Sequence, residues 1–218
     1  MHDYRAPAQG SATVLLDLVT ARARAAAATR SIQVASVIFL TALTAAAAQV
    51  SVPLPFTPVP FTLQPMVVLL GAAVLGARLG ALSQVLYLAA GIAGLQVFAF
   101  SPMLPQGGAR LLGPTGGFLL AYPIAAFVTG WLAERRFDRR YLTSVVAMFA
   151  GLTIVFAGGV AWLALLMPGA IGVQPALAAA FYPFVLADVA KVLLAAALLP
   201  MAWSFLSPGT GFTKIRKY

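Results

Sequence analysis

The sequence contains no cysteine and only one histidine, His2, and this excludes several kinds of chemical site. Without thiols there is no disulfide framework and no cysteine nucleophile, and a single imidazole leaves almost no ligands for a soft metal. Charged residues make up only 9% of the 218 residues, and five of them are acidic. The apolar segments hold no Ser/His/Asp set and no paired carboxylates, so we predict a protein that is not an enzyme and needs no cofactor.

A motif for nucleotide hydrolysis is also missing from the sequence. There is no glycine-rich phosphate loop of the nucleotide-hydrolase type, so energy from ATP would have to come from a partner subunit. The net charge of +9 would indicate nucleic-acid binding in a soluble protein. In this chain, however, the cationic residues lie between apolar segments, as membrane topology signals do, so no nucleic-acid partner is expected.

Apolar residues are what the sequence has in abundance. They make up 61% of the chain, and the mean hydropathy is +0.95. This is more apolar surface than a soluble domain of this length can bury, so the lipid bilayer must cover much of it. We therefore predict a multi-pass integral membrane protein.

Proline, glycine and charge divide the chain into six apolar segments, which predicts an all-α integral membrane protein with six transmembrane helices. The second segment is short for a bilayer crossing, and the sixth exceeds the roughly 20 residues that a span needs, so the start of the sixth is expected to tilt or protrude. The expected spans are residues 33–50, 62–77, 79–100, 115–133, 141–167 and 176–206.

The segments define three regions. Residues 1–33 are expected to be a cytoplasmic tail that can form an amphipathic helix at the membrane surface. Residues 34–206 form the transmembrane domain, and residues 207–218 form a basic cytoplasmic tail. With both termini in the cytoplasm, Arg110 is the one cation in the outer loops, as the positive-inside rule requires. The inside then receives Arg22, Arg24, Arg30, Arg78, Arg135, Arg136, Arg139, Arg140, Lys214, Arg216 and Lys217.

Asp188 and Lys191 are the only acid and the only lysine within the long apolar segments. At a helix centre each costs about 2.5 to 3.5 kcal/mol on translocon-based scales, and such residues usually face a protein interior or a water-filled pathway. Their i, i+3 spacing places them on one helix face. Either they neutralise each other, or they line a pocket in which the carboxylate accepts ligand N–H groups and the ammonium binds an anionic oxygen. For Arg110 the alternatives are a solvated loop arginine and a binding residue.

Several dispersed motifs occur together in this chain. They are the segments 59–64 (VPFTLQ), 76–81 (GARLGA), 97–99 (VFA) and 113–118 (GPTGGF), the residues Tyr87, Gly91 and Gly94, and Asp188 with Lys191. In this order they resemble the biotin-specific substrate-binding components of energy-coupling factor transporters, the BioY family. The resemblance extends over roughly residues 35–205 and leaves the first 30 residues outside it.

This resemblance implies a six-helix protein with cytoplasmic termini that captures biotin from outside and works with a transmembrane coupling subunit and a pair of ABC-type ATPases. It implies that Asp188 accepts hydrogen bonds from the ureido ring of biotin and that Lys191 or Arg110 meets the carboxylate. Phe118 stands where a tyrosine is expected in the family. The other binding residues implied are Thr62, Gln64, Tyr87, Phe98, Thr115, Gly116 and Phe118.

The family also uses small residues on its first helix, in an alanine-x-x-x-alanine pattern, to dock the coupling subunit. Ala42 and Ala46 match this pattern, and small residues let helix backbones approach closely in lipid. The surrounding segment is rich in alanine, so packing within the chain is the alternative reading.

Two other functions remain open at this point. A proton-coupled secondary transporter of a small carboxylate-bearing molecule would use Asp188 as its proton site. A purely structural membrane subunit would bind no ligand.

Overall fold

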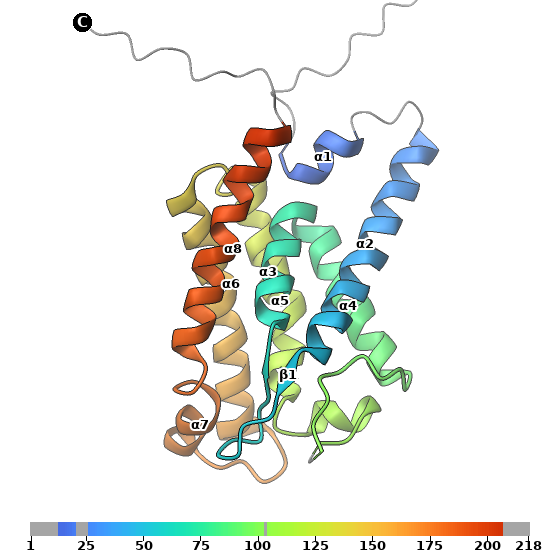
Figure 1. The fold of residues 1–218 in the computed structure, drawn as a ribbon. Helices are drawn as coiled ribbons and strands as arrows, with labels where there is room; N and C mark the ends of the chain where they lie inside the picture. Colours follow the sequence, from blue (N-terminus) through green and yellow to red (C-terminus); the bar gives the residue numbers. More distant parts are fainter. Residues whose placement is uncertain (1–12, 21–25, 103, 207–218) are drawn as a thin grey trace, which may run out of the picture.

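The structure is a computed structural model that describes residues 13–20, 26–102 and 104–206, and these form a helical bundle (Figure 1). A short antiparallel pair of strands, β1 (Ser51–Val52) and β2 (Phe61–Thr62), aligns Ser51 with Thr62. The helices are α1 (Leu15–Thr20), α2 (Ala26–Gln49), α3 (Gln64–Leu75), α4 (Ala77–Ile92), the 3-10 helix η2 (Gly107–Leu112), α5 (Gly116–Glu134), α6 (Tyr141–Ala161), the π-helical turn η3 (Trp162–Leu166), α7 (Val173–Ala180) and α8 (Val185–Leu206).

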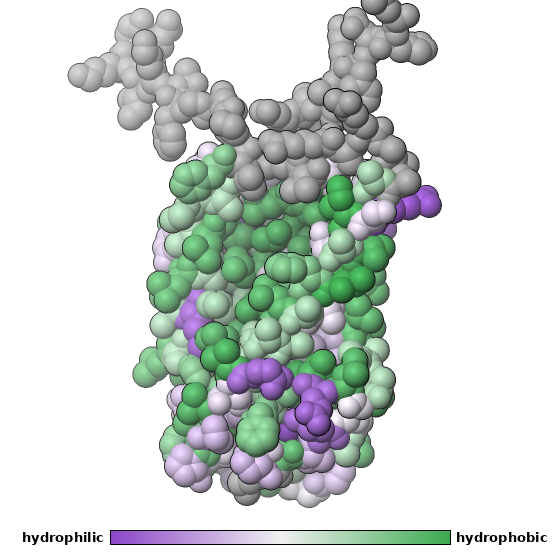
Figure 2. All heavy atoms as spheres, turned by 45° about the vertical axis from the view of Figure 1, so that its right-hand side comes forward, coloured by the Kyte–Doolittle hydropathy of each residue, from purple (hydrophilic) through white to green (hydrophobic). Residues whose placement is uncertain are grey.

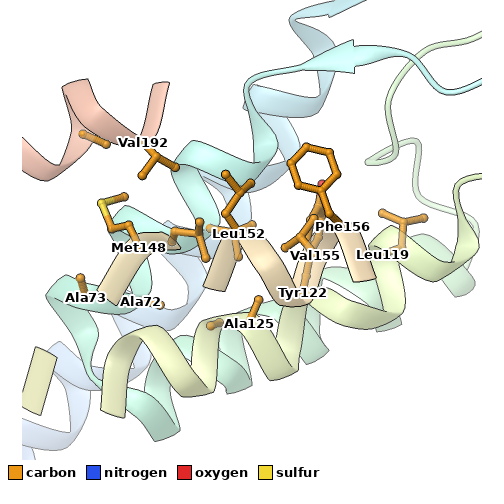
Figure 3. Packing of buried hydrophobic residues seen from close by; sticks show 14 of the residues in the cluster. Ala72, Ala73, Leu119, Tyr122, Ala125, Met148, Leu152, Val155, Phe156 and Val192 are labelled. Carbon is orange, nitrogen blue, oxygen red and sulfur yellow. The ribbon is translucent and has the colours of Figure 1, made fainter. Parts of the chain in front are cut away.

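Helix α5 packs against α3, α4 and α6, while α2 contacts α3 and α4, and α8 contacts α3 and α6. One end of the bundle carries β1, β2, η2 and α7, and the other carries α1 and the turn between α5 and α6 (Figure 1). Small residues allow this close packing, because Ala72, Ala73 and Ala125 are fully buried between helices (Figure 3). Ala126 is fully buried as well.

The outer surface of the bundle is apolar over its middle (Figure 2). Phe39, Leu142, Leu194 and Phe205 are each 68–76% exposed, and many other large apolar residues are exposed with them. A soluble monomer rarely exposes so much contiguous apolar surface. This surface confirms the prediction of a multi-pass membrane protein.

Within the described residues, four helical stretches have the length and apolar composition needed to cross a bilayer: Ala28–Gln49, Gly116–Glu134, Tyr141–Leu166 and Val185–Phe205. Helices α3 and α4 have 12 and 16 residues. At 1.5 Å per residue they extend only about 18 and 24 Å, less than the roughly 30 Å of hydrocarbon.

Two predicted helix boundaries are wrong for local reasons. The first long helix begins at Ala26 instead of residue 33, so the boundary at residue 33 falls inside α2. The third predicted span ends at Ile92 instead of residue 100, because the chain turns at Gly94, whose φ of +96° belongs to the left-handed region that favours glycine.

The sixth predicted span, residues 176–206, is not one helix. The chain leaves α7 at Ala180, turns through residues 181–184 and enters α8 at Val185. Pro183 lies in this turn, and proline cannot donate the backbone hydrogen bond that a continuous helix needs. The excess length of the sixth segment is therefore a separate helix instead of a protrusion.

The N-terminal region contains the short helix α1, which packs on the bundle. Val14, Leu15 and Leu16 are buried in the apolar core, and α1 contacts α2, α3 and α8, so these apolar side chains face the bundle. The Oδ2 atom of Asp17 accepts hydrogen bonds from the backbone of Thr13 and Val14 at 2.7 and 3.0 Å and so holds the start of α1. The predicted basic tail, residues 207–218, lies outside the described residues.

The turn between α5 and α6 is tied to two other helices. Glu134 Oε1 accepts a hydrogen bond from the backbone N–H of Ala77 at 2.9 Å, at the N-terminus of α4, where a negative charge is favourable. Asp138 is fully buried and accepts a hydrogen bond from the Trp203 indole of α8, over which the Arg139 guanidinium stacks at 3.2 Å. Burial raises the pKa of the Asp138 carboxyl, while the Trp203 hydrogen bond and the Arg139 charge oppose this.

We expect Asp138→Ala to destabilise the protein by about 1–3 kcal/mol, because the buried Trp203 N–H loses its acceptor. Thermal unfolding in detergent, followed by tryptophan fluorescence, measures the effect. Asp138→Asn keeps an acceptor and removes the buried charge, so its loss should be smaller. Equal unfolding temperatures for Asp138→Ala and wild type would contradict this role.

Candidate functional site

A cavity lies among the helices at the end that carries β1, β2 and η2. Its empty volume, including the open mouth, is about 580 Å³. The walls come from β2, from the loops next to it and η2, and from α3, α5, α6 and α8. The lining residues are Val59, Pro60, Phe61, Thr62, Gln64, Pro65, Phe98, Ala99, Arg110, Thr115, Phe118, Leu119, Tyr122, Val155, Phe156, Phe184 and Asp188.

Most of this wall is apolar. Phe61 and Phe184 stack with their ring centroids 6.4 Å apart, and Phe98 and Phe118 contribute two more rings to the lining. On α5 and α6, Leu119 and Val155 are further lining residues (Figure 3). Such a wall suits a ligand with an apolar body and a few polar groups at defined positions.

Asp188 and Lys191 form an ion pair, but only Asp188 lines the cavity. The Lys191 ammonium donates to Asp188 Oδ1 and to the backbone carbonyl of Thr62, both at 2.7 Å, and lies 3.5 Å from the centre of the Phe61 ring. Asp188 Oδ2 has no hydrogen-bond partner among the described residues. The pair therefore neutralises itself through one carboxylate oxygen and leaves the other available to a ligand.

Arg110 is not a solvated loop arginine, because it is only 1% exposed. Its Nε donates to the hydroxyl of Thr115 at 3.0 Å, and its two Nη atoms donate to the carbonyls of Pro105 at 3.3 Å and Ala99 at 2.7 Å. Within the described part of the chain no carboxylate pairs with it. Burial lowers the pKa of this guanidinium, but an arginine stays charged, so the cavity wall holds an uncompensated positive charge.

Gln64 and Tyr87 form a second buried polar group. Gln64 Nε2 donates to the hydroxyl of Tyr87 at 2.7 Å, and that hydroxyl donates to the carbonyl of Val97 at 3.1 Å. Gln64 lines the cavity, whereas Tyr87 is fully buried behind it and packs edge-on against Phe98. Tyr87 thus supports the wall and does not face a ligand directly.

Gly116 also lies outside the lining. A Cβ at this position would collide with the Leu111 carbonyl, so glycine allows the start of α5 to pack against η2. The indole of Trp162 donates to the Gly113 carbonyl at 2.9 Å and fixes the same turn. This packing places Thr115 against Arg110 at the cavity wall.

The structure brings together seven of the ten predicted binding residues at the cavity: Thr62, Gln64, Phe98, Arg110, Thr115, Phe118 and Asp188. Lys191, Tyr87 and Gly116 lie behind it. Tyr122, Phe156 and Phe184 were missed. The helical spacing contained the signal for Tyr122 and Phe184, because each lies four residues from a predicted site residue, Phe118 and Asp188 respectively.

Ala42 and Ala46, which the sequence predicts to dock a coupling subunit, do not line the cavity. Both are exposed on α2, one helical turn apart. Both small side chains are therefore accessible on the surface of α2.

Comparison with known proteins identifies the family. Residues 19–208 match the model of the BioY family. A probable biotin transporter BioY of Pyrococcus horikoshii is 39% identical over 160 residues, which cover 73% of this chain and 88% of that protein. The biotin transporter BioY of Thermotoga maritima is 40% identical over 158 residues, which cover 72% and 86%.

A solved structure has the same fold. It is described as the S-component for biotin from an ECF-type ABC transporter, and it superposes with a TM-score of 0.71 at 23% identity over 80% of this chain and 92% of that chain. The resemblance seen in the motifs is thereby confirmed, and the chain belongs to the BioY family.

Proposed function

We propose that this protein captures biotin at the cytoplasmic membrane as the substrate-specific component of an ECF-type vitamin transporter. The observation that carries the proposal is one apolar cavity whose wall holds a carboxylate oxygen of Asp188 and the uncompensated cation of Arg110. Biotin combines a ureido ring with N–H donors, an apolar body and a terminal carboxylate. The names of the relatives support the same ligand.

In this proposal the ligand is bound at both polar ends. Asp188 Oδ2 accepts a hydrogen bond from an N–H group of the ureido ring. Lys191 donates to Asp188 Oδ1 and to the Thr62 carbonyl and so holds the Asp188 carboxylate in place. Arg110 meets the carboxylate of biotin. We favour Arg110 over Lys191 because Lys191 is engaged with Asp188 and does not reach the wall, whereas Arg110 lines it.

Six membrane crossings are proposed, formed by α2, α3, α4, α5, α6 with η3, and α8, with both termini in the cytoplasm. The placement of charge supports this orientation. Arg78 starts α4, and the cations of residues 135–140 follow α5, at the end of the bundle that carries α1, while Arg110 lies at the opposite end (Figure 1). The residues before α2 and residues 207–218 would then lie on the cytoplasmic side.

Transport driven by ATP requires partners, because the sequence has no nucleotide-binding loop. We propose a transmembrane coupling subunit and a pair of ABC-type ATPases as these partners. The exposed pair Ala42 and Ala46 on α2 offers a small-residue face against which a partner helix can pack closely.

Equilibrium binding of radiolabelled biotin and of other vitamins to the purified protein tests the proposal. We expect saturable binding of biotin and no competition from riboflavin or thiamine, since neither carries a carboxylate for Arg110. Binding of another vitamin in place of biotin, or of none, would overturn the assignment.

The two alternatives have less support. A proton site at Asp188 would need a carboxyl that exchanges protons freely, but this carboxylate is bound to the ammonium of Lys191. A purely structural subunit would not need a cavity with an unpaired buried cation. Uptake by vesicles that contain this chain alone, abolished when the pH gradient collapses, would favour the proton-coupled carrier.

A further inference from the structure

Tyr122 is a polar residue of the cavity whose hydroxyl the protein itself does not use. The residue lies on α5, is only 4% exposed and lines the cavity. Its hydroxyl has no hydrogen-bond partner among the described residues. Its neighbours on α6 in the cavity wall, Val155 and Phe156, are apolar and offer none (Figure 3).

A buried tyrosine hydroxyl usually has a hydrogen-bond partner, because an unsatisfied polar group in an apolar interior is unfavourable. Tyr87, at the same end of the bundle, follows this rule with both Gln64 and Val97 as partners. If Tyr122 only filled space, phenylalanine would serve as well at this position. The unused hydroxyl therefore indicates a partner that enters the cavity.

The remaining polar groups of the cavity define what that partner offers. Asp188 is ionised in its pair with Lys191 and can only accept hydrogen bonds, so it matches the N–H groups of a ureido ring and not its carbonyl. Arg110 lies beside Thr115, at the start of α5, and Tyr122 lies almost two helical turns further along the same helix. A ligand carboxylate at Arg110 would leave the opposite, ureido end of the molecule nearer to Tyr122.

We propose that the Tyr122 hydroxyl donates a hydrogen bond to the carbonyl oxygen of the ureido ring of biotin. The inference rests on the proposed function. It assigns complementary roles to two helices, since Asp188 on α8 accepts from an N–H group of the ring and Tyr122 on α5 donates to the carbonyl. A ring with this donor and acceptor pattern is thereby distinguished from one that lacks the carbonyl.

Tyr122→Phe tests the inference, because it removes the hydroxyl and keeps the aromatic ring. We expect about tenfold weaker binding of biotin, the usual effect of losing one neutral hydrogen bond to a ligand. A biotin analogue with sulfur in place of the ureido oxygen is a poor acceptor, so its affinity should change less than threefold between wild type and variant. Isothermal titration in detergent measures all four affinities.

Tyr182→Phe is the matched control, because Tyr182 is 62% exposed and does not line the cavity. The affinity of this variant for biotin should equal that of wild type. Unchanged thermal unfolding of Tyr122→Phe would show that the variant folds. Equal affinity of Tyr122→Phe and wild type for biotin would overturn the inference and leave the proposed function intact. An equal loss for biotin and its sulfur analogue would also overturn it. Failure of the wild type to bind biotin would instead overturn the proposed function.

Discussion

Biotin binding is expected to fall by about 30-fold to several thousandfold when Asp188 is replaced by alanine. The range corresponds to the roughly 2–5 kcal/mol that truncating one member of a buried, hydrogen-bonded charge pair costs. Two effects combine in this loss. The ureido ring loses the acceptor Oδ2 for its N–H group, and the Lys191 ammonium keeps only the Thr62 carbonyl as a hydrogen-bond partner among the described residues. Equilibrium binding with purified variant measures the change.

The second effect could weaken binding simply by destabilising the protein, so a double variant is needed as a control. Asp188→Ala combined with Lys191→Met removes both charges and leaves no ammonium unpaired in the bundle. We expect this variant to recover thermal stability relative to Asp188→Ala while still failing to bind biotin. Recovery of wild-type biotin affinity by the double variant would show that Asp188 only neutralises Lys191 and touches no ligand.

Arg110→Gln is expected to weaken biotin binding by about 10- to 150-fold, the equivalent of the roughly 1.5–3 kcal/mol of a hydrogen bond to a charged group. Because the guanidinium also holds the loop through Ala99, Pro105 and Thr115, some of the loss would reflect the loop and not the ligand charge. The neutral primary amide of biotin separates the two contributions. In wild type it should bind more weakly than biotin.

The informative quantity is the ratio of the affinities for biotin and its amide. If Arg110 meets the carboxylate, this ratio should fall towards one in Arg110→Gln, since the loop effect acts on both ligands alike. Arg78→Gln makes the same change of charge at an exposed residue at the other end of the bundle and should leave the ratio unchanged. An unchanged ratio in Arg110→Gln would show that another residue binds the carboxylate of biotin, and Lys191 would be tested next.

The sequence alone was enough to predict a membrane protein and its family. An apolar fraction of 61% and the positions of the cations predict helices in lipid whatever their arrangement, because they depend on composition and local order. The motifs from Val59 to Gln64 and from Gly113 to Phe118 identified the family for the same reason, since a motif is read along the chain. Asp188 and Arg110 drew attention because a charge in an apolar segment and a lone cation in an outer loop are visible without coordinates.

Helix boundaries were partly readable from the sequence. The helix that starts at Tyr141 was predicted at its observed first residue, after a run of charged residues that marks the end of the preceding span. The break at Pro183 was missed, although proline is a local signal, because the apolar segment continues on both sides of it. The burial of Val14, Leu15 and Leu16 had no local signal at all, since it depends on where α2, α3 and α8 lie.

Which side chains face the cavity was decided by tertiary structure alone. The spacing of Asp188 and Lys191 allowed either to meet a ligand, and the rotation of α8 against β2 directs Lys191 to the Thr62 carbonyl and leaves Asp188 on the wall. Arg110 is buried because the backbone carbonyls of Ala99 and Pro105 surround it, and Tyr122 lines the site because α5 packs against α6. The physical reason is that composition determines which solvent surrounds a helix, whereas the direction of one side chain depends on contacts between residues far apart in the chain.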